Sequence, residues 1–425
     1  MAMEPLLPHG SGERSRGLPV SPVKRRACWS AVVLLLCAGT AHGQIPPEPD
    51  PSNARVRLGP LWLNPTVAVT DVGIDTNVFN DADEDEPKRD FTLTVSPQTD
   101  LSLRMGRTWL LGNIREDIVW YDKYESERSV NNSYRVNWLV PLTRLSFVVG
   151  GDWVFTRERP GFEIDLRSGR TERGADGAFE VRTLSRTLVG ARGAVRKIEF
   201  DDVEYLGQNL RIQLNRTFTA GILTVRHELT PLTSFTADIG RQQERFEFTP
   251  FRDADSLQAT IGLRFDTFAV LNGSAQFGFR AYTPLSSDLP SYAGSIAAVN
   301  LSYVALGSTR LGLQILRDVQ HSFDFDQPYY LQTGVAATIG QQIYGPLDIE
   351  GRVGRQLMQY RDRAGAAVAV TDREDRVRSY GGGIGYRIGR DLRIAFNGDR
   401  RKRVSKVEGR TYDDLRYGVA VSFGR

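Results

Sequence analysis

The chain has 425 residues, of which 54 are basic and 51 acidic, so its formal net charge is only +3. This length is enough for two or three ordinary domains or for one large barrel. Two cysteines and four histidines leave little scope for a disulfide framework or a zinc site.

Residues 1–43 have the features of a secretory signal. Basic residues at 24–26 precede an apolar run at 27–38, which is followed by the sequence AHG at 41–43. The run is shorter than the about 20 residues that a membrane-spanning helix needs. We therefore expect residues 1–43 to be a signal peptide that is cleaved after Gly43.

Removal of this signal changes the character of the remaining chain. Both cysteines leave with it, as do five basic and two acidic residues, which leaves 49 of each. The mature chain is therefore neutral, without thiolate chemistry and without the basic excess of nucleic-acid-binding proteins. Only His227 and His321 remain as histidines, which does not favour a zinc site.

The first clear strand pattern follows a proline-rich lead-in at residues 44–59, for which we expect no fold of its own. Between 91 and 105 apolar residues alternate with polar ones, at Phe91, Leu93, Val95, Leu101, Leu103 and Met105. The polar residues between them include Thr92, Thr94, Gln98, Asp100 and Arg104. Because successive side chains of a strand point to opposite faces, this segment predicts a strand with one apolar and one polar face.

The alternation recurs to the end of the chain and predicts an all-β protein of about eighteen strands, in a range of sixteen to twenty. Bacterial single-chain barrels have an even number of strands, with short periplasmic turns and longer outer loops. This order requires residues 201–216 to form one outer loop. A strand at 206–214 would place the compact turn that follows outside and all later long loops on the periplasmic side. The other outer loops are then centred near Asp81, Glu125, Phe162, Asp253, Asp288, Asp324, Ala366 and Glu408.

We therefore expect residues 60–425 to form a single-chain antiparallel transmembrane β-barrel in a bacterial outer membrane, with both termini in the periplasm. Tyr417, Val419, Val421 and Phe423 alternate almost to the C-terminus, as in strands that the barrel-insertion machinery reads. Aromatic residues near strand ends are expected in interface girdles, at Trp62, Trp109, Trp120, Tyr121, Tyr124, Tyr282, Tyr303, Tyr329, Tyr360 and Tyr412. A soluble β-sandwich, whose core also uses aromatic residues, is the alternative.

Catalytic and metal sites are not favoured by the residues present. His321, Ser322 and an aspartate such as Asp318 or Asp324 could form a hydrolase site, but a polar loop base is the simpler interpretation. The acidic run DADEDE could bind Ca²⁺, yet it lacks EF-hand spacing and is better read as a solvated loop. The GGG triplet lies inside a strand pattern and is expected to make room in the wall rather than to bind phosphate. We expect no enzymatic activity, no cofactor and no metal.

Polar residues on the opposite faces of the strands point to a lumen. A charge that faces lipid at mid-membrane costs about 2–4 kcal/mol, so these side chains must face inward. A barrel of this size is wide enough for an aqueous channel unless a loop fills it. The candidate pore-lining residues are Arg104, Asp117, Asp152, Arg192, Asp238, Arg264, Arg280, Glu350, Arg352, Arg393, Asp399 and Arg416.

Five segments resemble the putative β-barrel porin 2 family. They are GIDTNVF at 73–79, LTPLTSF at 229–235, RDADS at 252–256, SFDFDQPYY at 322–330 and RVRSYGGGIGYRIG at 376–389. The resemblance covers most of the mature chain. It implies an outer-membrane barrel of a kind often associated with exopolysaccharide synthesis and export, and it brings no catalytic residues.

The leading hypothesis is a passive outer-membrane pore for exopolysaccharide or another hydrophilic solute. Mixed charges, amides and hydroxyls on the polar faces suit hydrated, hydrogen-bonding solutes and do not favour a strongly ion-selective pore. The expected partners are outer-membrane lipid, the insertion machinery and periplasmic polysaccharide-export components, and no nucleic acid. The alternatives are a plugged structural or adhesive barrel with partner-binding outer loops, and a surface hydrolase.

Overall fold

The computed structural model describes residues 45–50, 54–266, 269–366, 368 and 370–424. The expected signal peptide and its cleavage site lie outside these residues. No helix in the described part of the chain is long and apolar enough to cross a membrane.

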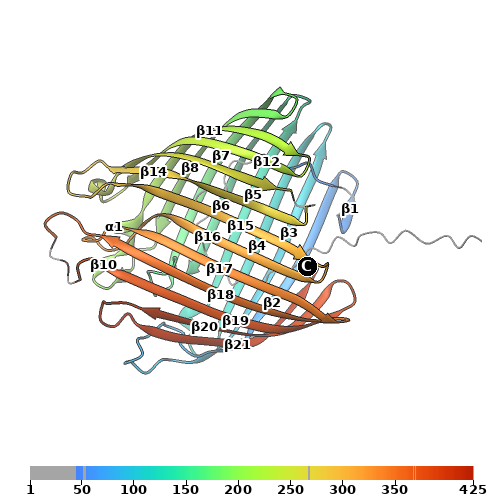
Figure 1. Cartoon of the computed structure of the whole chain (residues 1–425). Helices are drawn as coiled ribbons and strands as arrows, with labels where there is room; N and C mark the ends of the chain where they lie inside the picture. Colours follow the sequence, from blue (N-terminus) through green and yellow to red (C-terminus); the bar gives the residue numbers. More distant parts are fainter. Residues whose placement is uncertain (1–44, 51–53, 267–268, 367, 369, 425) are drawn as a thin grey trace, which may run out of the picture.

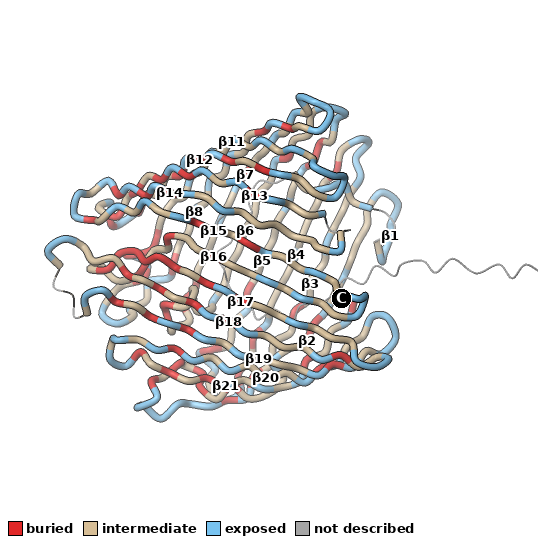
Figure 2. Tube along the Cα trace, in the orientation of Figure 1, coloured by how far each residue is buried: buried red, intermediate tan, exposed pale blue. Residues whose placement is uncertain are grey.

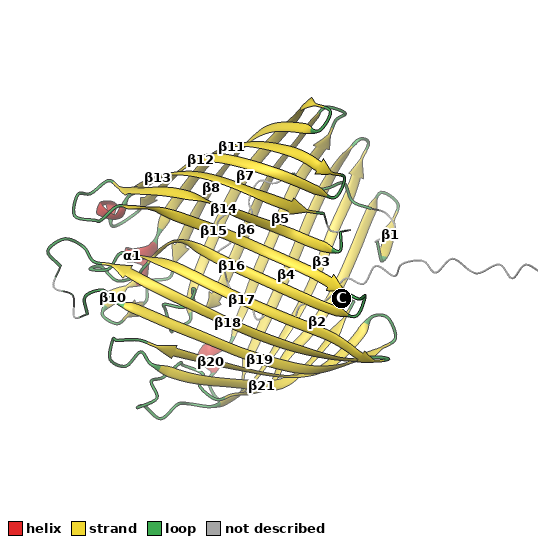
Figure 3. Ribbon diagram, viewed as in Figure 1, coloured by secondary structure: helices red, strands yellow, loops and turns green. Residues whose placement is uncertain are grey.

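Eighteen long strands form the wall of a closed antiparallel barrel (Figures 1 and 3). They are β2 (Leu61–Asp75), β3 (Asp90–Met105), β4 (Thr108–Tyr121), β5 (Ser129–Pro141), β6 (Leu145–Glu158), β7 (Ser168–Leu184), β8 (Thr187–Phe200), β11 (Arg216–Thr230), β12 (Thr233–Phe246), β13 (Ala254–Phe265), β14 (Leu271–Pro284), β15 (Tyr292–Ala305), β16 (Thr309–His321), β17 (Tyr329–Tyr344), β18 (Leu347–Arg361), β19 (Glu374–Ile388), β20 (Leu392–Val404) and β21 (Tyr412–Phe423). The predicted fold class and strand number are confirmed.

Each strand pairs with its neighbours in sequence, and the first and last strands close the ring. In that seam β2 pairs antiparallel with β21, from Val67 opposite Phe423 to Asp75 opposite Arg416, with an irregularity between Val69 and Val72. A three-residue strand, β1 (Val56–Leu58), pairs with the start of β2 inside the predicted lead-in. Closure leaves no free edge among the barrel strands, which is what a sheet in lipid requires.

The strands carry their apolar residues on the outside, the reverse of a soluble protein. On β13, Leu257 and Ile261 are 55% and 59% exposed, whereas the polar Ser256 and Gln258 on either side of Leu257 are 8% and 6% exposed. Alternation along a strand sends one set outward and the other toward the lumen. This pattern fits lipid outside and a polar interior.

Short turns connect the strands at one end of the barrel, and nine longer loops connect them at the other (Figure 1). The segment between β8 and β11 belongs to the long-loop end, where it contains β9 (Glu204–Tyr205), β10 (Gln208–Asn209) and the helix α1 (Leu210–Leu214). The expectation that 201–216 lies outside the wall is therefore confirmed, except that Arg216 begins β11. The C-terminus lies at the short-turn end (Figure 1).

The expected aromatic girdle is wrong for most of its members. Trp109, Tyr121, Tyr282, Tyr329, Tyr360 and Tyr412 are all at most 5% exposed. They occupy lumen-facing positions or contact loops that fold inward, so lipid would not reach them. Tyr303 is exposed as predicted. Buried segments gather toward the long-loop end of the barrel (Figure 2), and that end contains the candidate site.

Candidate functional site

Inward-facing charges line the lumen as ion pairs between strands. Arg393 of β20 contacts Asp348 of β18 at 2.6 Å, and Arg192 of β8 lies 3.6 Å from Asp238 of β12. These strands are not adjacent, because one other strand lies between the members of each pair: β19 in the first and β11 in the second. The side chains therefore bridge the wall from the inside and neutralise each other within the lumen.

Two of these bridges cross a glycine on the intervening strand. Asp152 of β6 pairs with Arg196 of β8 at 3.0 Å, and Gly174 of β7 is opposite both residues. A Cβ atom added at Gly174 would lie 2.6 Å from the Asp152 carboxylate oxygen. Only a residue without a side chain leaves room for a carboxylate and a guanidinium to meet over the backbone.

The second bridge repeats the arrangement at the GGG triplet of β19. Arg352 of β18 donates to Asp399 of β20 at 3.0 Å across Gly381, whose added Cβ would lie only 1.9 Å from the Asp399 carboxylate. The expectation that this triplet makes room in the wall agrees with the geometry. A glycine beneath an ion pair between next-nearest strands therefore occurs in two distant parts of the barrel.

The predicted pore-lining residues fall into two groups. Ten of them contact an opposite charge on the inner face: Asp117 with Arg115, Asp152 with Arg135 and Arg196, Arg192 with Asp238, Arg280 with Asp318, Arg352 with Glu350 and Asp399, Arg393 with Glu350, and Arg416 with Asp75. The other two are not part of these pairs. Arg264 lines a small cavity of about 40 Å³ beside Arg192 and Asp238, and Arg104 donates to the Gly106 carbonyl near a short turn. That these residues line a conducting pore stays a prediction.

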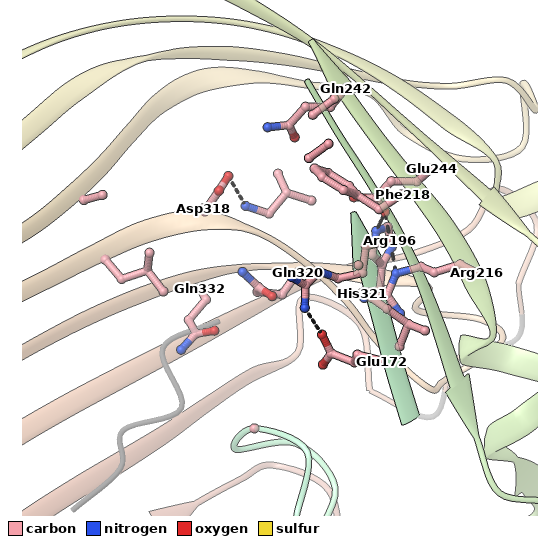
Figure 4. A pocket seen from close by; sticks show the side chains of 18 of the residues that line it. Glu172, Arg196, Arg216, Phe218, Gln242, Glu244, Asp318, Gln320, His321 and Gln332 are labelled. Carbon is pink, nitrogen blue, oxygen red and sulfur yellow. Dashed lines mark hydrogen bonds and ion pairs between the residues drawn. The ribbon is translucent and has the colours of Figure 1, made fainter. Parts of the chain in front are cut away.

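A chamber of about 570 Å³ opens inside the barrel against the inner faces of β4–β8 and β11–β17. Figure 4 shows Arg196 bonded to Glu172 on one side of the chamber, and Asp318 on another. Apolar side chains such as Phe218, Ile222 and Leu316 also line it. The chamber therefore presents paired charges, amides and apolar surface to whatever occupies it.

The end of β16 separates from β15, stays paired with β17, and places the His321 side chain inside the barrel. β16 pairs with β15 only as far as Arg317, but it pairs with β17 up to His321. His321 then contacts Glu244 of β12, as the dashed line in Figure 4 shows. This contact joins strands that are not neighbours, so it narrows the lumen at this level.

The loop at residues 159–167 crosses the lumen from one wall to the other. It begins after β6, yet the carboxylate of Glu163 accepts a hydrogen bond from Ser322 Oγ at 2.6 Å, and Ser322 follows β16 on the opposite side of the ring. Asp165 of the same loop accepts from Arg403 of β20 at 3.0 Å and from Asn80 at 3.0 Å. Contacts with strand β20 and with the loops after β2 and β16 hold this loop inside the barrel.

Two further loops pack against it. Residues 201–215 and 322–328 contribute most of an apolar cluster at the long-loop end, made of Ile164, Phe200, Leu210, Leu214 and Phe323. We call residues 159–167, 201–215 and 322–328 together the loop plug. Apolar packing between loops means that the plug is a folded body and not a set of solvated connections.

Arg252 lies at the centre of the contacts around the plug. Its guanidinium donates to the carbonyl and side-chain oxygens of Gln213, both at 2.9 Å, and to the Ser322 and Pro328 carbonyls. The residue is 1% exposed and comes from the loop between β12 and β13. One buried cation therefore ties three loops together, and burial lowers its pKa to about 10, which still leaves it charged at neutral pH.

Burial also shifts the pKa values of two groups within the loop plug. The pKa of the Glu163 carboxyl is raised because desolvation outweighs the attraction of Arg373, Arg410 and Arg403. The pKa of Tyr205 is raised to about 12 by burial and by the nearby Asp165 carboxylate. The raised pKa means that Glu163 takes up a proton at a higher pH than an ordinary glutamate.

The residues of the hypothetical hydrolase are engaged elsewhere. Ser322 Oγ donates to Glu163, His321 contacts Glu244, and Asp318 pairs with Arg280 at 2.7 Å. Ser322 is fully buried. Nucleophile and base therefore have partners other than each other, which is not the geometry of a Ser–His–acid triad. Among the described residues there is also no group of His, Cys, Asp or Glu side chains that could hold a metal ion.

The short-turn end has an apolar lining that the sequence pattern did not predict. Trp109, Leu139 and Val148 form a buried cluster on the inner face, and Ile45 of the lead-in packs against it. Glu48 accepts a hydrogen bond from the Trp109 indole at 3.4 Å. Residues 45–50 therefore lie at the short-turn mouth of the barrel rather than away from it.

Residues 50–425 match the family described as putative beta-barrel porin 2. The chain belongs to this family. Members are porin-like barrels of the bacterial outer membrane, which agrees with the apolar exterior and the polar interior. No curated protein matches the sequence.

Three solved structures are similar to this chain at low sequence identity. A BenF-like porin from Pseudomonas fluorescens Pf-5 is 10% identical, with 85% of this chain and 98% of that chain covered and a TM-score of 0.46. OccAB4 from Acinetobacter baumannii is 8% identical, with 85% and 97% covered and a TM-score of 0.46. OpdK from Pseudomonas aeruginosa is 10% identical, with 85% and 98% covered and a TM-score of 0.43.

The plug residues Glu163 and Asp165 and the neighbouring Arg252 were not predicted from the sequence because they lie in loops, outside any strand pattern. Glu163, Asp165 and Arg252 lie between strands, where a polar composition predicts exposure. The sequence did contain a signal for the strand residues Arg403 and Asp375, which pair at 2.6 Å. Both alternate with outward residues, so their position in the strand assigns them to the inner face.

Proposed function

We propose that this barrel is a passive outer-membrane pore for hydrophilic solutes, with exopolysaccharide as the favoured class. The observation that carries the proposal is a lumen whose charges are largely paired and whose chamber adds amide and apolar surface. Paired charges give little net field, so the lining would bind hydroxyl-rich neutral or weakly charged chains by hydrogen bonds. The twelve candidate residues would then act as lining and not as a catalytic set.

The proposed orientation has the long loops outside the cell and both termini in the periplasm, after removal of residues 1–43. In bacterial barrels the longer loops are extracellular. The C-terminal strand would be read by the insertion machinery, and the short-turn mouth would face periplasmic polysaccharide-export components. Residues 44–59 would then form a lead-in that contacts this mouth.

Conductance of the refolded protein in a planar bilayer tests the pore. We expect small, discrete channels in the native protein, and a several-fold larger conductance when residues 160–166 are replaced by a short Gly-Ser linker, because that loop crosses the lumen. A matched control replaces residues 406–409 of the exposed loop before β21 and should conduct like the native protein. Absence of channels from both the native and the loop-shortened protein at any voltage would overturn the proposal.

The solute class needs a separate measurement on the same channels. Neutral oligosaccharides added to the bath should reduce the current in a length-dependent manner if glycan chains enter the lumen. Block of the current by charged dicarboxylates, with no block by oligosaccharides at the same concentration, would instead favour a pore for small anions.

A plugged structural or adhesive barrel is the second candidate, and the loop plug favours it. Its apolar cluster and the Arg252 contacts resemble a permanent seal more than a mobile gate. In that case the loop-shortened variant alone would conduct. The native barrel would then remain closed across all voltages and pH values.

A further inference from the structure

The outer surface of the barrel carries one row of cations that the sequence did not single out. Arg355 of β18 is the register partner of Arg378 on β19, and Arg378 is the register partner of Lys402 on β20. All three side chains are exposed. We call these three residues the cationic row. Figure 1 shows that β18, β19 and β20 lie side by side in the wall.

The cationic row faces outward. On β19, Arg378 alternates with inward-facing Asp375 and Val377, which are buried, and has the same parity as Tyr380 and Ile384, which are 52% and 59% exposed. The row therefore projects from the same face as the lipid-facing stripe.

The row lies at one edge of the apolar band. From Ile388, at the short-turn end of β19, to Arg378 is ten residues. At about 3.3 Å per residue and a tilt of about 40°, this rise is about 25 Å, the height of the apolar band in outer-membrane barrels. The row is thus placed where hydrocarbon ends and lipid headgroups begin, on the side of the long loops.

The protein itself supplies little negative charge to the cationic row. No hydrogen bond or ion pair joins Arg355, Arg378 or Lys402 to another described residue. Asp413 of β21, the acid opposite Lys402, attracts it electrostatically, but Arg400 makes the stronger interaction and donates to both oxygens of that carboxylate at 2.5 and 2.9 Å. Like charges directly opposite on neighbouring strands destabilise a sheet, so the row needs an external anion.

Outward cations elsewhere on the barrel contrast with this row. Lys197 of β8 pairs with Glu199 at 2.8 Å, and Arg241 and Arg245 of β12 both pair with Asp255 at 2.7 and 2.6 Å. There the protein supplies an outward acid for the cations. Along β18–β20 the outward acids are engaged by other cations, because Glu374 pairs with Arg376 and Asp413 pairs with Arg400, both at 2.5 Å. Among the described residues, the cationic row therefore has no acid of its own within ion-pair distance.

We propose that the cationic row is a binding site for the phosphates of an outer-leaflet glycolipid. Three cations on adjacent strands span about 10 Å, since neighbouring strands are about 4.8 Å apart. Guanidinium groups bind phosphate oxygens in a bidentate manner, and lysine adds a point charge. The acyl chains of the same lipid would lie against the outward residues below, where Val353, Tyr380 and Leu415 are exposed and Arg400, in the same register row, is paired with Asp413. The inference rests on the proposed orientation, with the long loops outside the cell.

Lipid binding by the detergent-solubilised full-length barrel tests this site. The probe is diphosphorylated lipid A, counted as adducts by native mass spectrometry. The triple variant Arg355→Gln, Arg378→Gln, Lys402→Gln should bind the probe at least about tenfold more weakly than the native protein. The matched control is Lys197→Gln, Arg241→Gln, Arg245→Gln, which removes the same charge from paired positions and should bind within about twofold of native.

Three outcomes would overturn the proposal. The triple variant could retain native binding, or both variants could lose affinity equally, which would indicate a general effect of net charge. Inorganic phosphate could compete at the same concentration as lipid A, which would indicate a site for soluble anions. Heat-modifiable migration on a gel verifies that each variant is folded. Channel conductance of the triple variant should equal that of the native protein, so failure of the pore proposal and failure of this one are distinguishable.

Discussion

At the scale of single residues, glycine decides which charges can meet in the lumen. Gly174 and Gly381 each lie beneath an ion pair that joins the two strands on either side. A barrel wall ordinarily couples only neighbouring strands through its hydrogen bonds. These bridges couple next-nearest strands, and they depend on positions with no side chain.

Substitution of Gly381 tests that dependence. Gly381→Val places a branched side chain into the Arg352–Asp399 pair, so we expect about 1–3 kcal/mol of destabilisation from displaced groups. The measurement is the urea midpoint of the barrel refolded in lipid vesicles. Gly398→Val, at an outward position on β20 with open space around it, is the control and should be neutral. Equal midpoints for the two variants would contradict the role of Gly381.

A second prediction concerns Glu163 and pH. Burial raises its pKa in the folded plug above that in the unfolded chain. Protonated Glu163 therefore stabilises the plug. This stabilisation is complete below the pKa that Glu163 has in the unfolded chain, and it is lost as pH rises through the raised pKa of the folded plug. We expect the native channel to close increasingly in acid, which single-channel open probability against pH would show.

The variant Glu163→Gln should remove this response. A neutral amide can still accept the Ser322 hydrogen bond, so the plug should remain closed at neutral pH as it is in acid. Glu408→Gln, in an exposed loop, should keep the native pH profile. A native profile in Glu163→Gln would mean that another group controls the closure.

At the scale of elements, the seam between β2 and β21 decides whether the sheet becomes a barrel. Gly73 and Gly418 are opposite each other in that seam, and a Cβ added at Gly73 would lie 1.9 Å from the Tyr417 carbonyl oxygen. The close approach is between backbones and leaves no flexible group that could move away. The backbone pairing of β2 with β21 and the Arg416–Asp75 ion pair at 2.8 Å join the two strands of the seam.

Gly73→Val should therefore prevent closure. An open sheet in lipid leaves a row of backbone groups without partners, which costs several kcal/mol for each group. We expect loss of heat-modifiable migration and of protease resistance in outer-membrane fractions. Gly340→Val on β17, where nothing lies within contact distance, should assemble normally. Normal migration of Gly73→Val would show that the seam tolerates a side chain.

At the scale of the whole molecule, paired charges determine how the lumen treats ions. Because most inward arginines face an acid, the lumen should show a potassium-to-chloride permeability ratio within about twofold of unity. Asp152→Asn, Asp238→Asn and Asp399→Asn together remove three negative charges from the lumen and should shift the reversal potential toward anion preference. An unchanged reversal potential in an ion gradient would mean that the current does not pass these pairs.

The sequence alone determined the wall of this molecule. Alternation at residues such as Phe91 and Thr92 requires only that side chains of a strand point to opposite faces, so strand number, loop order and the inner face follow from a local rule. The same rule assigns Asp152 and Arg352 to the lumen. It could also have assigned Tyr360 and Tyr412 inward, where proximity to a strand end suggested a girdle.

Only the tertiary structure decided how the lumen is filled. The partners of Glu163 and Arg252 are distant in the chain, and they meet because closure of the ring brings opposite loops together. The same holds for the cationic row, whose members are neighbours through register rather than through sequence. A periodic pattern specifies which face a residue occupies, whereas the partner on that face depends on curvature, register and ring closure, which are properties of the whole sheet.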